Sequence, residues 1–314
     1  MLNRPVILSM NGPSPRPSPV RRERVPAGRM REGSWPRSRS ASNVRLCLVL
    51  AAVLAGVLAL GQTRRFRGGP PDPAERGNVP QWQLTPGFEQ DAFVFARLKY
   101  RSTMDRTSYA WWTDYRDADL NLSYRLQQVT SLKVDPEGRV IELDSGQLAN
   151  HPFVFMSGVP AIVMDDREIR VLRDYLLNGG FLLVDDFWGE RPWEHFQREV
   201  LRRLFPARQA EELPLEHPIF HCVFHVRAKP QIPNVGFAVR NRDTGVTWEV
   251  ADGRTPHYRG ISDDKGRLMV LACHNTDLGD GWEEEATDPY YFAEFSEPKA
   301  YPLGINIVFY ALTH

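Results

Sequence analysis

Residues 172–189, LRDYLLNGGFLLVDDFWG, join the end of a helix to a buried strand with an acidic tip. The apolar residues of the first part recur at helical spacing, and Asp165 or Asp166 can cap the start of that helix. Gly179 and Gly180 then provide left-handed residues of the kind that end a helix. The pattern predicts a helix that stops at the two glycines and leads directly into a strand.

The strand of this stretch is residues 181–184, a continuous apolar run. Such a run is typical of a parallel strand covered on both faces. It stops at Asp185 and Asp186, and in open α/β sheets ligands bind beyond the carboxyl ends of the strands. The two carboxylates therefore indicate either a binding site or a pair of caps for the next helix.

The rest of the folded body repeats this alternation. Further buried strands are expected at residues 93–98, 152–157 and 268–273, and helices at 118–132, from Pro192 to Leu204, and at 302–312. Residues 134–143 suggest a small hairpin, 213–226 an extended segment and 278–286 an acidic loop. Strands separated by helices of 10–15 residues indicate a parallel sheet with right-handed crossovers. We predict one α/β domain at residues 88–314, a three-layer sandwich around a mostly parallel sheet.

The formal net charge of zero hides an uneven distribution along the 314 residues. Residues 1–80 contain 14 arginines, no lysine and four acids, whereas the remainder has 25 basic and 35 acidic residues. A mildly acidic body argues against nucleic acid as the main partner. Residues 1–45 are rich in Arg, Pro and Ser, a disordered composition, and residues 62–87 have a linker composition.

Residues 46–60, LCLVLAAVLAGVLAL, form an uncharged apolar segment after this lead. Its length suits the core of a secretory signal, with cleavage after Gly61, and is short for a membrane span. The arginines that follow oppose cleavage and favour an uncleaved anchor, and a buried helix is a third alternative. The first two alternatives place the body outside the cytoplasm, in the periplasm or secreted, with membrane contact only through residues 46–60 if they are retained. Met30 is an alternative start to Met1.

Polar side chains follow each predicted strand, and aromatic residues accompany them. In a parallel sheet these ends converge on one rim, which is the default location of a ligand site. The expected ligand-binding residues are Arg101, Trp112, Asp114, Ser157, Asp185, Asp186, Trp188, His274, Asn275 and Asp277. Among them Asp185, Asp186 and His274 are the candidate catalytic groups, although neighbouring strand residues point to opposite faces.

No cofactor or metal is assigned from the sequence. An aspartate paired with His274 or Asp277 could hold a metal or act as a base. His217, His221 and His225 recur every four residues, but on a strand they would lie about 13 Å apart and could not share one ion. Nucleophile elbows of the Gly-x-Ser-x-Gly and Gly-x-Cys-x-Gly types are absent from the sequence.

Cys222 and Cys273 are the two cysteines that lie outside the apolar segment. They could pair if the fold brings them together, but buried free thiols are the expectation we favour.

Eight stretches resemble the family named domain of unknown function 4159 (DUF4159). They are FVFARLKYRS, WWTDYRDADLNLSYRL, PFVFMSGV, LRDYLLNGGFLLVDDFWGE, LPLEHPIFH, RTPHYRGI, HNTDLGDGWE and YPLGINIVFYALTH. The resemblance implies a flavodoxin-like fold related to class I glutamine amidotransferases, often behind a signal or membrane segment. It implies no activity, and the amidotransferase Cys-His-Glu triad is not carried over because no cysteine stands at the turn directly after Val184.

Together these observations favour a non-catalytic module that binds a small polar or carbohydrate-like ligand, or a protein partner, at the rim of the sheet. The alternative is a hydrolase that uses Asp185, Asp186 and His274, with or without a divalent metal.

Overall fold

The computed structural model describes residues 72, 76–77, 79–84, 86–88, 91–103 and 110–314. The chain divides into two compact units, Met1–Arg65 and Phe66–His314, and the account below concerns the second. The apolar segment at residues 46–60 lies outside the described residues. Within them, no helix is long and apolar enough to cross a membrane.

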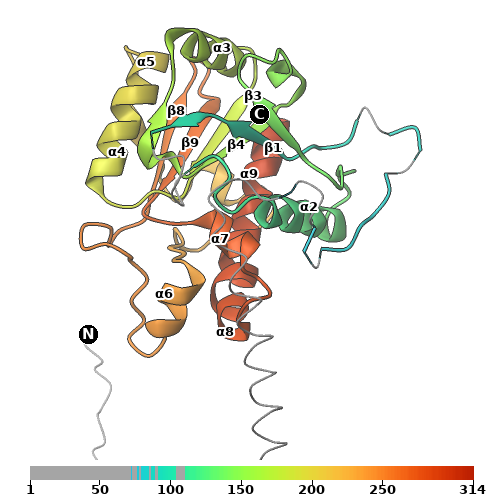
Figure 1. The fold of residues 1–314 in the computed structure, drawn as a ribbon, viewed down its shortest axis with the longest axis vertical. Helices are drawn as coiled ribbons and strands as arrows, with labels where there is room; N and C mark the ends of the chain where they lie inside the picture. Colours follow the sequence, from blue (N-terminus) through green and yellow to red (C-terminus); the bar gives the residue numbers. More distant parts are fainter. Residues whose placement is uncertain (1–71, 73–75, 78, 85, 89–90, 104–109) are drawn as a thin grey trace, which may run out of the picture. The chain divides into compact units, whose positions relative to one another are not determined.

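A seven-stranded sheet in the order β3-β1-β4-β6-β9-β8-β7 forms the centre of the domain (Figure 1). The first five strands run parallel, whereas β8 is antiparallel to β9 and β7 is antiparallel to β8. This confirms the predicted α/β architecture with a mostly parallel sheet. The strands are β1 (Ala96–Lys99), β3 (Arg139–Glu142), β4 (Phe153–Ser157), β6 (Phe181–Asp185), β7 (Glu211–Glu212), β8 (His257–Ser262) and β9 (Leu268–His274); β2 (Arg101–Ser102) and β5 (Ile162–Val163) form a separate pair.

Helices cover both faces of the sheet, in line with the expected three layers (Figure 1). One face carries α3 (Asp166–Leu177), α4 (Glu190–Phe196), a π-helical turn (Gln197–Leu201) and α5 (Arg202–Leu204). The other carries α2 (Asp117–Val129), α7 (Leu278–Glu283) and α9 (Tyr301–Thr313), the last preceded by α8 (Pro289–Tyr291) and a π-helical segment (Phe292–Ala300). The short helix α6 (Val235–Arg240) and 3-10 turns at Leu148–Asn150, Val159–Ala161 and Pro218–Phe220 complete the helical elements.

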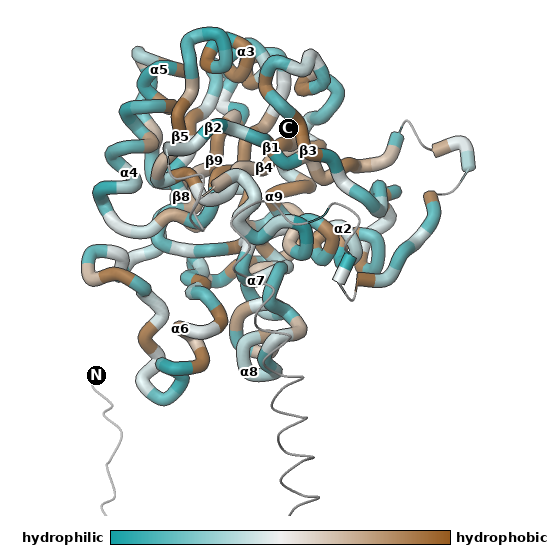
Figure 2. The backbone as a smooth tube through the Cα atoms, in the orientation of Figure 1, coloured by the Kyte–Doolittle hydropathy of each residue, from teal (hydrophilic) through white to brown (hydrophobic). Residues whose placement is uncertain are grey.

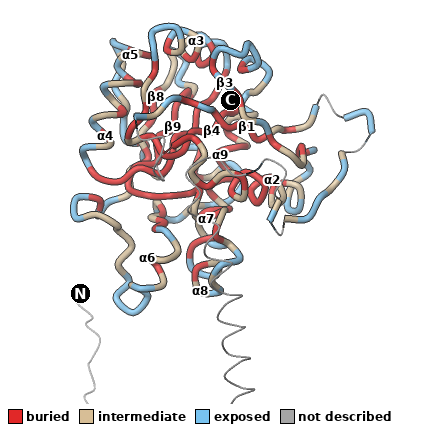
Figure 3. The backbone as a smooth tube through the Cα atoms, in the orientation of Figure 1, coloured by how far each residue is buried: buried red, intermediate tan, exposed pale blue. Residues whose placement is uncertain are grey.

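Alternation along the strands divides the apolar residues into two cores. In β6, Phe181 and Leu183 pack in the core under α2 and α9, whereas Leu182 and Val184 pack in the core under α3 and α4. The central strands are hydrophobic and buried throughout (Figures 2 and 3). A residue at the end of a strand therefore belongs to one face or the other according to its parity.

The helix and glycines of the opening stretch form largely as predicted. Asp165 caps α3 in a capping box with Glu168, and Gly179 adopts φ 107° at the helix end. Gly180 does not have a positive φ; instead, a Cβ at this position would lie 2.3 Å from the Tyr175 ring. Gly180 is thus required for close packing and not for a left-handed turn.

Three local expectations are wrong. The Asp135–Gly138 turn forms, but no hairpin results, because β3 pairs in parallel with β1. Residues 213–226 contain the 3-10 turn Pro218–Phe220 and are not extended, and the expected acidic loop begins with α7.

Candidate functional site

Three polar side chains of neighbouring strands lie on the face covered by α2 and α7. They are Arg97 in β1, Ser157 at the end of β4 and Asp185 at the end of β6. Each follows a phenylalanine or leucine of that core by two residues, and Ser157 lies directly opposite Asp185 in the parallel register. The carboxyl edge of the sheet is therefore polar on this face, as expected for a ligand site in an open α/β sheet.

Arg97 is fully buried and organises the segment that leads into α2. Its guanidinium donates to both carboxylate oxygens of Asp119 and to the carbonyl oxygens of Trp111 (3.1 Å) and Thr113 (2.7 Å). It also lies 4.8 Å from the centre of the Phe155 ring. A buried charge needs this degree of pairing, so Arg97 fixes the backbone on both sides of Trp112 and directly before Asp114.

Asp114 projects from this segment towards the strand ends. Its backbone is left-handed, with φ 63°, and Ser157 Oγ donates to its Oδ2 at 3.0 Å. Burial raises the pKa of Asp114 to about 6, although Arg97 and Ser157 act in the opposite direction. A carboxyl group with such a pKa exchanges its proton close to neutral pH.

Asp186 and Asp277 meet from two further segments. Asp186 follows β6 with φ 55°, and Asp277 caps α7 by accepting from the Asp280 N–H at 2.8 Å. One oxygen of each of these two carboxyl groups lies within 4.8 Å of the other. Burial raises both pKa values well above the ordinary range, with further contributions from neighbouring acids. When both are ionised, the Asp186 and Asp277 carboxylates repel each other, and a cation bound between them would offset that repulsion.

Asp185 lies beside this group, and only one of its two carboxylate oxygens accepts a hydrogen bond from the described residues. Its Oδ2 accepts from the Gly279 N–H at 2.8 Å, but its buried Oδ1 has no hydrogen-bond partner among the described residues. Burial raises the pKa of Asp185 well above its ordinary value, and the charge of Asp114 adds to the effect. A buried acceptor without a donor is costly unless a ligand or ion completes it.

The oxygens of this centre have a separation that suits one cation. One oxygen each of Asp114, Asp186 and Asp277 lie within 4.8 Å of one another. Ca²⁺ takes oxygen ligands at about 2.3–2.6 Å, so two ligands on opposite sides of it are about 4.6–5.2 Å apart. A donor set made only of oxygen suits hard ions such as Ca²⁺, Mg²⁺ or Mn²⁺. We call these three residues together with Asp185 the acidic centre.

His274 lies on the opposite face of the sheet from Asp185. It ends β9 at a position that faces α4, where its ring stacks between Phe187 (5.2 Å) and Trp193 (5.6 Å). Its Nε2 bonds to the Gly189 carbonyl and its Nδ1 to Arg259. Burial lowers the pKa of His274 to about 4. The ring is therefore neutral at physiological pH, and both nitrogens are already used within the protein.

The other predicted site residues have structural contacts of their own. Arg101 is exposed on β2 and pairs with Asp165 and Glu168 of the α3 start. Trp112 packs edge-on against Trp111. Asn275, with φ 60°, accepts from the Gly189 N–H and donates to Thr255, and Gly253 packs closely against both Asn275 and Trp188. The structure thus gathers Asp114, Ser157, Asp185, Asp186 and Asp277, and leaves Arg101 and His274 elsewhere.

The histidine series lies in a turn and not on a strand. The rings of His221 and His225 stack at 4.6 Å, so the expected separation of about 13 Å is wrong. His221 Nε2 bonds to the Leu215 carbonyl, and His217 caps the 3-10 turn through Ile219 N–H. Cys222 and Cys273 are both free; Cys273 is buried as expected, whereas Cys222 is exposed.

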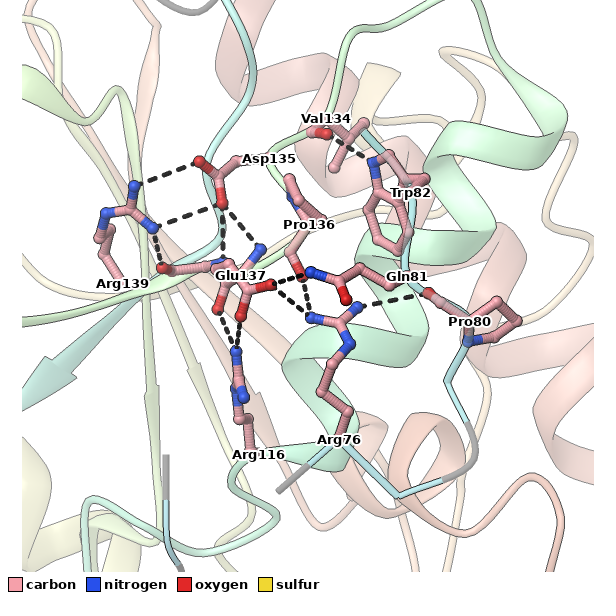
Figure 4. Close-up of polar contacts among 11 residues, drawn as sticks. Arg76, Pro80, Gln81, Trp82, Arg116, Val134, Asp135, Pro136, Glu137 and Arg139 are labelled. Atoms are coloured by element: carbon pink, nitrogen blue, oxygen red, sulfur yellow. Dashed lines mark hydrogen bonds and ion pairs between the residues drawn. The ribbon is translucent and has the colours of Figure 1, made fainter. Parts of the chain in front are cut away.

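A separate cavity of about 260 Å³ lies at the start of α2. Its lining residues are Tyr115, Arg116, Asp119, Glu137, Gly138, Arg139 and Val140. Figure 4 shows that Glu137 accepts hydrogen bonds from the side chains of Arg116, Arg76 and Gln81. The indole N–H of Trp82 donates to the Val134 carbonyl oxygen. The arginines of this cavity are already paired with acids, and the contacts of residues 76–82 hold the start of the domain against the β3 turn.

Three groups near the acidic centre are missing from the sequence predictions. Asp280 and Glu283 fall in the expected loop, and only the helical spacing of α7 turns them towards Asp114. Arg97 could have been identified from the sequence, because a charged residue inside an apolar strand needs an oppositely charged or hydrogen-bonding partner in the core.

The fold and the acidic centre define an α/β domain with a cluster of buried carboxyl groups at the carboxyl edge of its sheet. Residues 94–312 match the family described as "Domain of unknown function (DUF4159)", and the chain belongs to this family. A comparison with curated proteins finds no match.

Proposed function

We propose that this domain is a binding module that takes up a divalent cation at the acidic centre. The observation that carries the proposal is the convergence of Asp114, Asp186 and Asp277 within 4.8 Å while they are buried. Three clustered carboxylates are unfavourable without a counter-charge, and here Arg97 is already bound to Asp119. The unpartnered Oδ1 of Asp185 supports the same conclusion, because it offers a further oxygen beside the group.

A cation held there gives the rim an affinity for oxygen-rich ligands. Ca²⁺ and Mg²⁺ commonly keep part of their coordination for water or for ligand oxygens. The small polar or carbohydrate-like ligand expected at this edge would bind through such positions. A hydrolase based on Asp185, Asp186 and His274 has less support, because the His274 nitrogens are bonded to Gly189 and Arg259 on the other face.

Direct titration tests the proposed cation site. The protein is stripped with a chelator, dialysed at pH 7.5 and titrated calorimetrically with Ca²⁺, Mg²⁺ and Mn²⁺. We expect saturable binding and a rise in Tm that the chelator reverses. Asp277→Asn should weaken binding at least tenfold, whereas Asp144→Asn, at an exposed acid outside the centre, should leave it unchanged. Failure of the folded protein to bind any of the three ions at millimolar concentration would refute the proposal.

We further propose that the domain acts outside the cytoplasm and that its fold is of the flavodoxin-like, glutamine amidotransferase-like type. Residues 46–60 support the location through their apolar composition. Alkaline phosphatase fused after residue 87 in a bacterial host tests it, because that reporter is active only after export. An inactive, stably produced fusion would contradict the proposed location.

A further inference from the structure

The loop that follows the 3-10 turn Pro218–Phe220 exposes two adjacent apolar side chains. Val223 is 44% exposed and Phe224 is 37% exposed. The other large hydrophobic side chains that are exposed in the described part of the chain are scattered singly, which is normal for a protein surface. A neighbouring pair on one loop marks a place where the domain can contact something apolar. We call residues 222–225 the tip loop.

The conformation of the tip loop is fixed from below by a buried asparagine. Asn306 is fully buried in the largely apolar helix α9, and its Oδ1 accepts from the N–H groups of Val223 (3.0 Å) and Phe224 (2.7 Å). Its Nδ2 donates to the Phe224 carbonyl oxygen at 2.8 Å. The Val226 N–H closes the base of the loop on the Phe220 carbonyl oxygen at 3.0 Å. A buried amide is costly unless it is hydrogen-bonded, so the domain invests in holding this loop with its apolar side chains outward.

The chain around the tip loop is basic, although the domain as a whole is acidic. Residues 217–242 contain four basic residues, three histidines and no acid, whereas residues 81–314 contain 25 basic and 35 acidic residues. Arg227 is exposed and forms no ion pair with the residues that the structure describes, and His225 is exposed beside it. Lys229, in contrast, is paired with Glu212. The exposed apolar pair therefore lies next to a cation that is available to an anionic partner.

The small size and the charge of this surface fit a lipid membrane better than a protein. A standard protein interface buries about 800 Å² on each partner, far more than two partly exposed side chains can supply. Membrane binding needs only apolar side chains that enter the boundary between headgroups and acyl chains, helped by cations that attract anionic headgroups.

We propose that the tip loop inserts Val223 and Phe224 into the surface of a membrane that contains anionic lipid, with Arg227 against the phosphate headgroups. This contact is independent of the proposed cation site. It is also additional to any contact made by residues 46–60.

A fluorophore on the tip loop tests this contact separately from residues 46–60, because quenching by a nitroxide-labelled lipid reports only where the label lies. The full chain is prepared with Cys47→Ser, Cys222→Ser and Val223→Cys and is labelled with bimane; Cys273 is buried. In phosphatidylcholine vesicles with about 30% phosphatidylglycerol, we expect the nitroxide lipid to lower the emission at least about twofold.

A second label position serves as the matched control. Glu194 is exposed on α4, which covers the opposite face of the sheet from α9. Bimane on Glu194→Cys, in the same background without Val223→Cys, should keep its emission in the same vesicles. Equal quenching at positions 194 and 223, or no quenching at position 223, would overturn the proposal.

Substitutions separate the apolar contribution from the charge. Phe224→Ser should at least halve the quenching at position 223, whereas Val129→Ser, at an exposed apolar residue of α2, should leave it unchanged. Arg227→Gln should weaken the quenching, as should vesicles of phosphatidylcholine alone. Unchanged quenching in Phe224→Ser that remains folded by circular dichroism would overturn the insertion. Equal quenching in the neutral and the anionic vesicles would overturn the anionic membrane as the partner.

Discussion

Replacing Asp114 with asparagine is expected to stabilise the metal-free protein while it removes cation binding. Asparagine tolerates the left-handed backbone at φ 63° and can still accept the hydrogen bond from Ser157 through its side-chain oxygen. It cannot carry the negative charge that the centre concentrates. The substitution therefore separates the charge of this side chain from its shape.

The size of the effect follows from the pKa of Asp114, which burial raises from 3.8 to about 6. Each pKa unit corresponds to about 1.4 kcal/mol, so ionised Asp114 costs the folded state about 3 kcal/mol. Because the folded state binds this proton more tightly than the unfolded chain, the cost is complete above about pH 6 and disappears as the pH falls towards 4. The variant should gain about 3 kcal/mol at pH 8 and nothing at pH 4.

Urea unfolding in the presence of a chelator, at pH 8 and at pH 4, measures this difference. Adding Mn²⁺ at pH 8 should then raise the stability of the natural protein and leave the variant unchanged. The explanation would be refuted if the chelated variant were less stable than the natural protein at pH 8, or if the difference were the same at both pH values.

Three further substitutions test the parts around the centre. Burial lowers the pKa of His274 to about 4, so the folded state binds this proton less tightly than the unfolded chain. The free energy of unfolding should therefore fall by up to about 3 kcal/mol between pH 6.5 and pH 4 because of this group. His274→Gln should lack this decrease, and equal pH slopes for the variant and the natural protein would contradict the explanation. Arg97→Met leaves Asp119 buried without its cation and should cost about 3–5 kcal/mol in denaturant unfolding. Addition of Asp119→Leu should recover most of that loss, and a double variant no more stable than the single one would argue against the pairing. Gly279→Ala should weaken cation binding in calorimetry at least tenfold by displacing Asp114. Gly236→Ala should not, because the added Cβ would meet only the ends of the Arg240 and Asn234 side chains; equal affinities of the two variants would exclude the steric role of Gly279.

Local signals were sufficient for much of the fold. The apolar runs of β4, β6 and β9 and the final helix α9 are short-range patterns, and they are present as predicted. Of the two aspartates expected as caps of α3, Asp165 is the one that caps it. The pairing of β3 was not predictable in this way. The turn before it is the same whether the chain folds back on itself or joins another strand, and its partner β1 is far away in the sequence.

The convergence of acidic side chains at one edge of the sheet was predictable, but the exact set of residues was not. Asp114, Ser157, Asp185, Asp186 and Asp277 lie close together near the carboxyl edge of the sheet, where they are expected from the sequence. His274 is separated from them because alternation along β9 turns it to the opposite face. Such parity depends on the exact register of each strand, which composition alone does not specify.

The three ligands of the proposed cation come from widely separated parts of the chain. Asp114 and Asp186 are about 70 residues apart, and Asp186 and Asp277 about 90. An ion bound by them would close two long loops, as a pair of covalent cross-links would, but a chelator could open both. Because the ion would stabilise the folded state, the resistance of the domain to proteolysis would depend on the metal concentration of its surroundings.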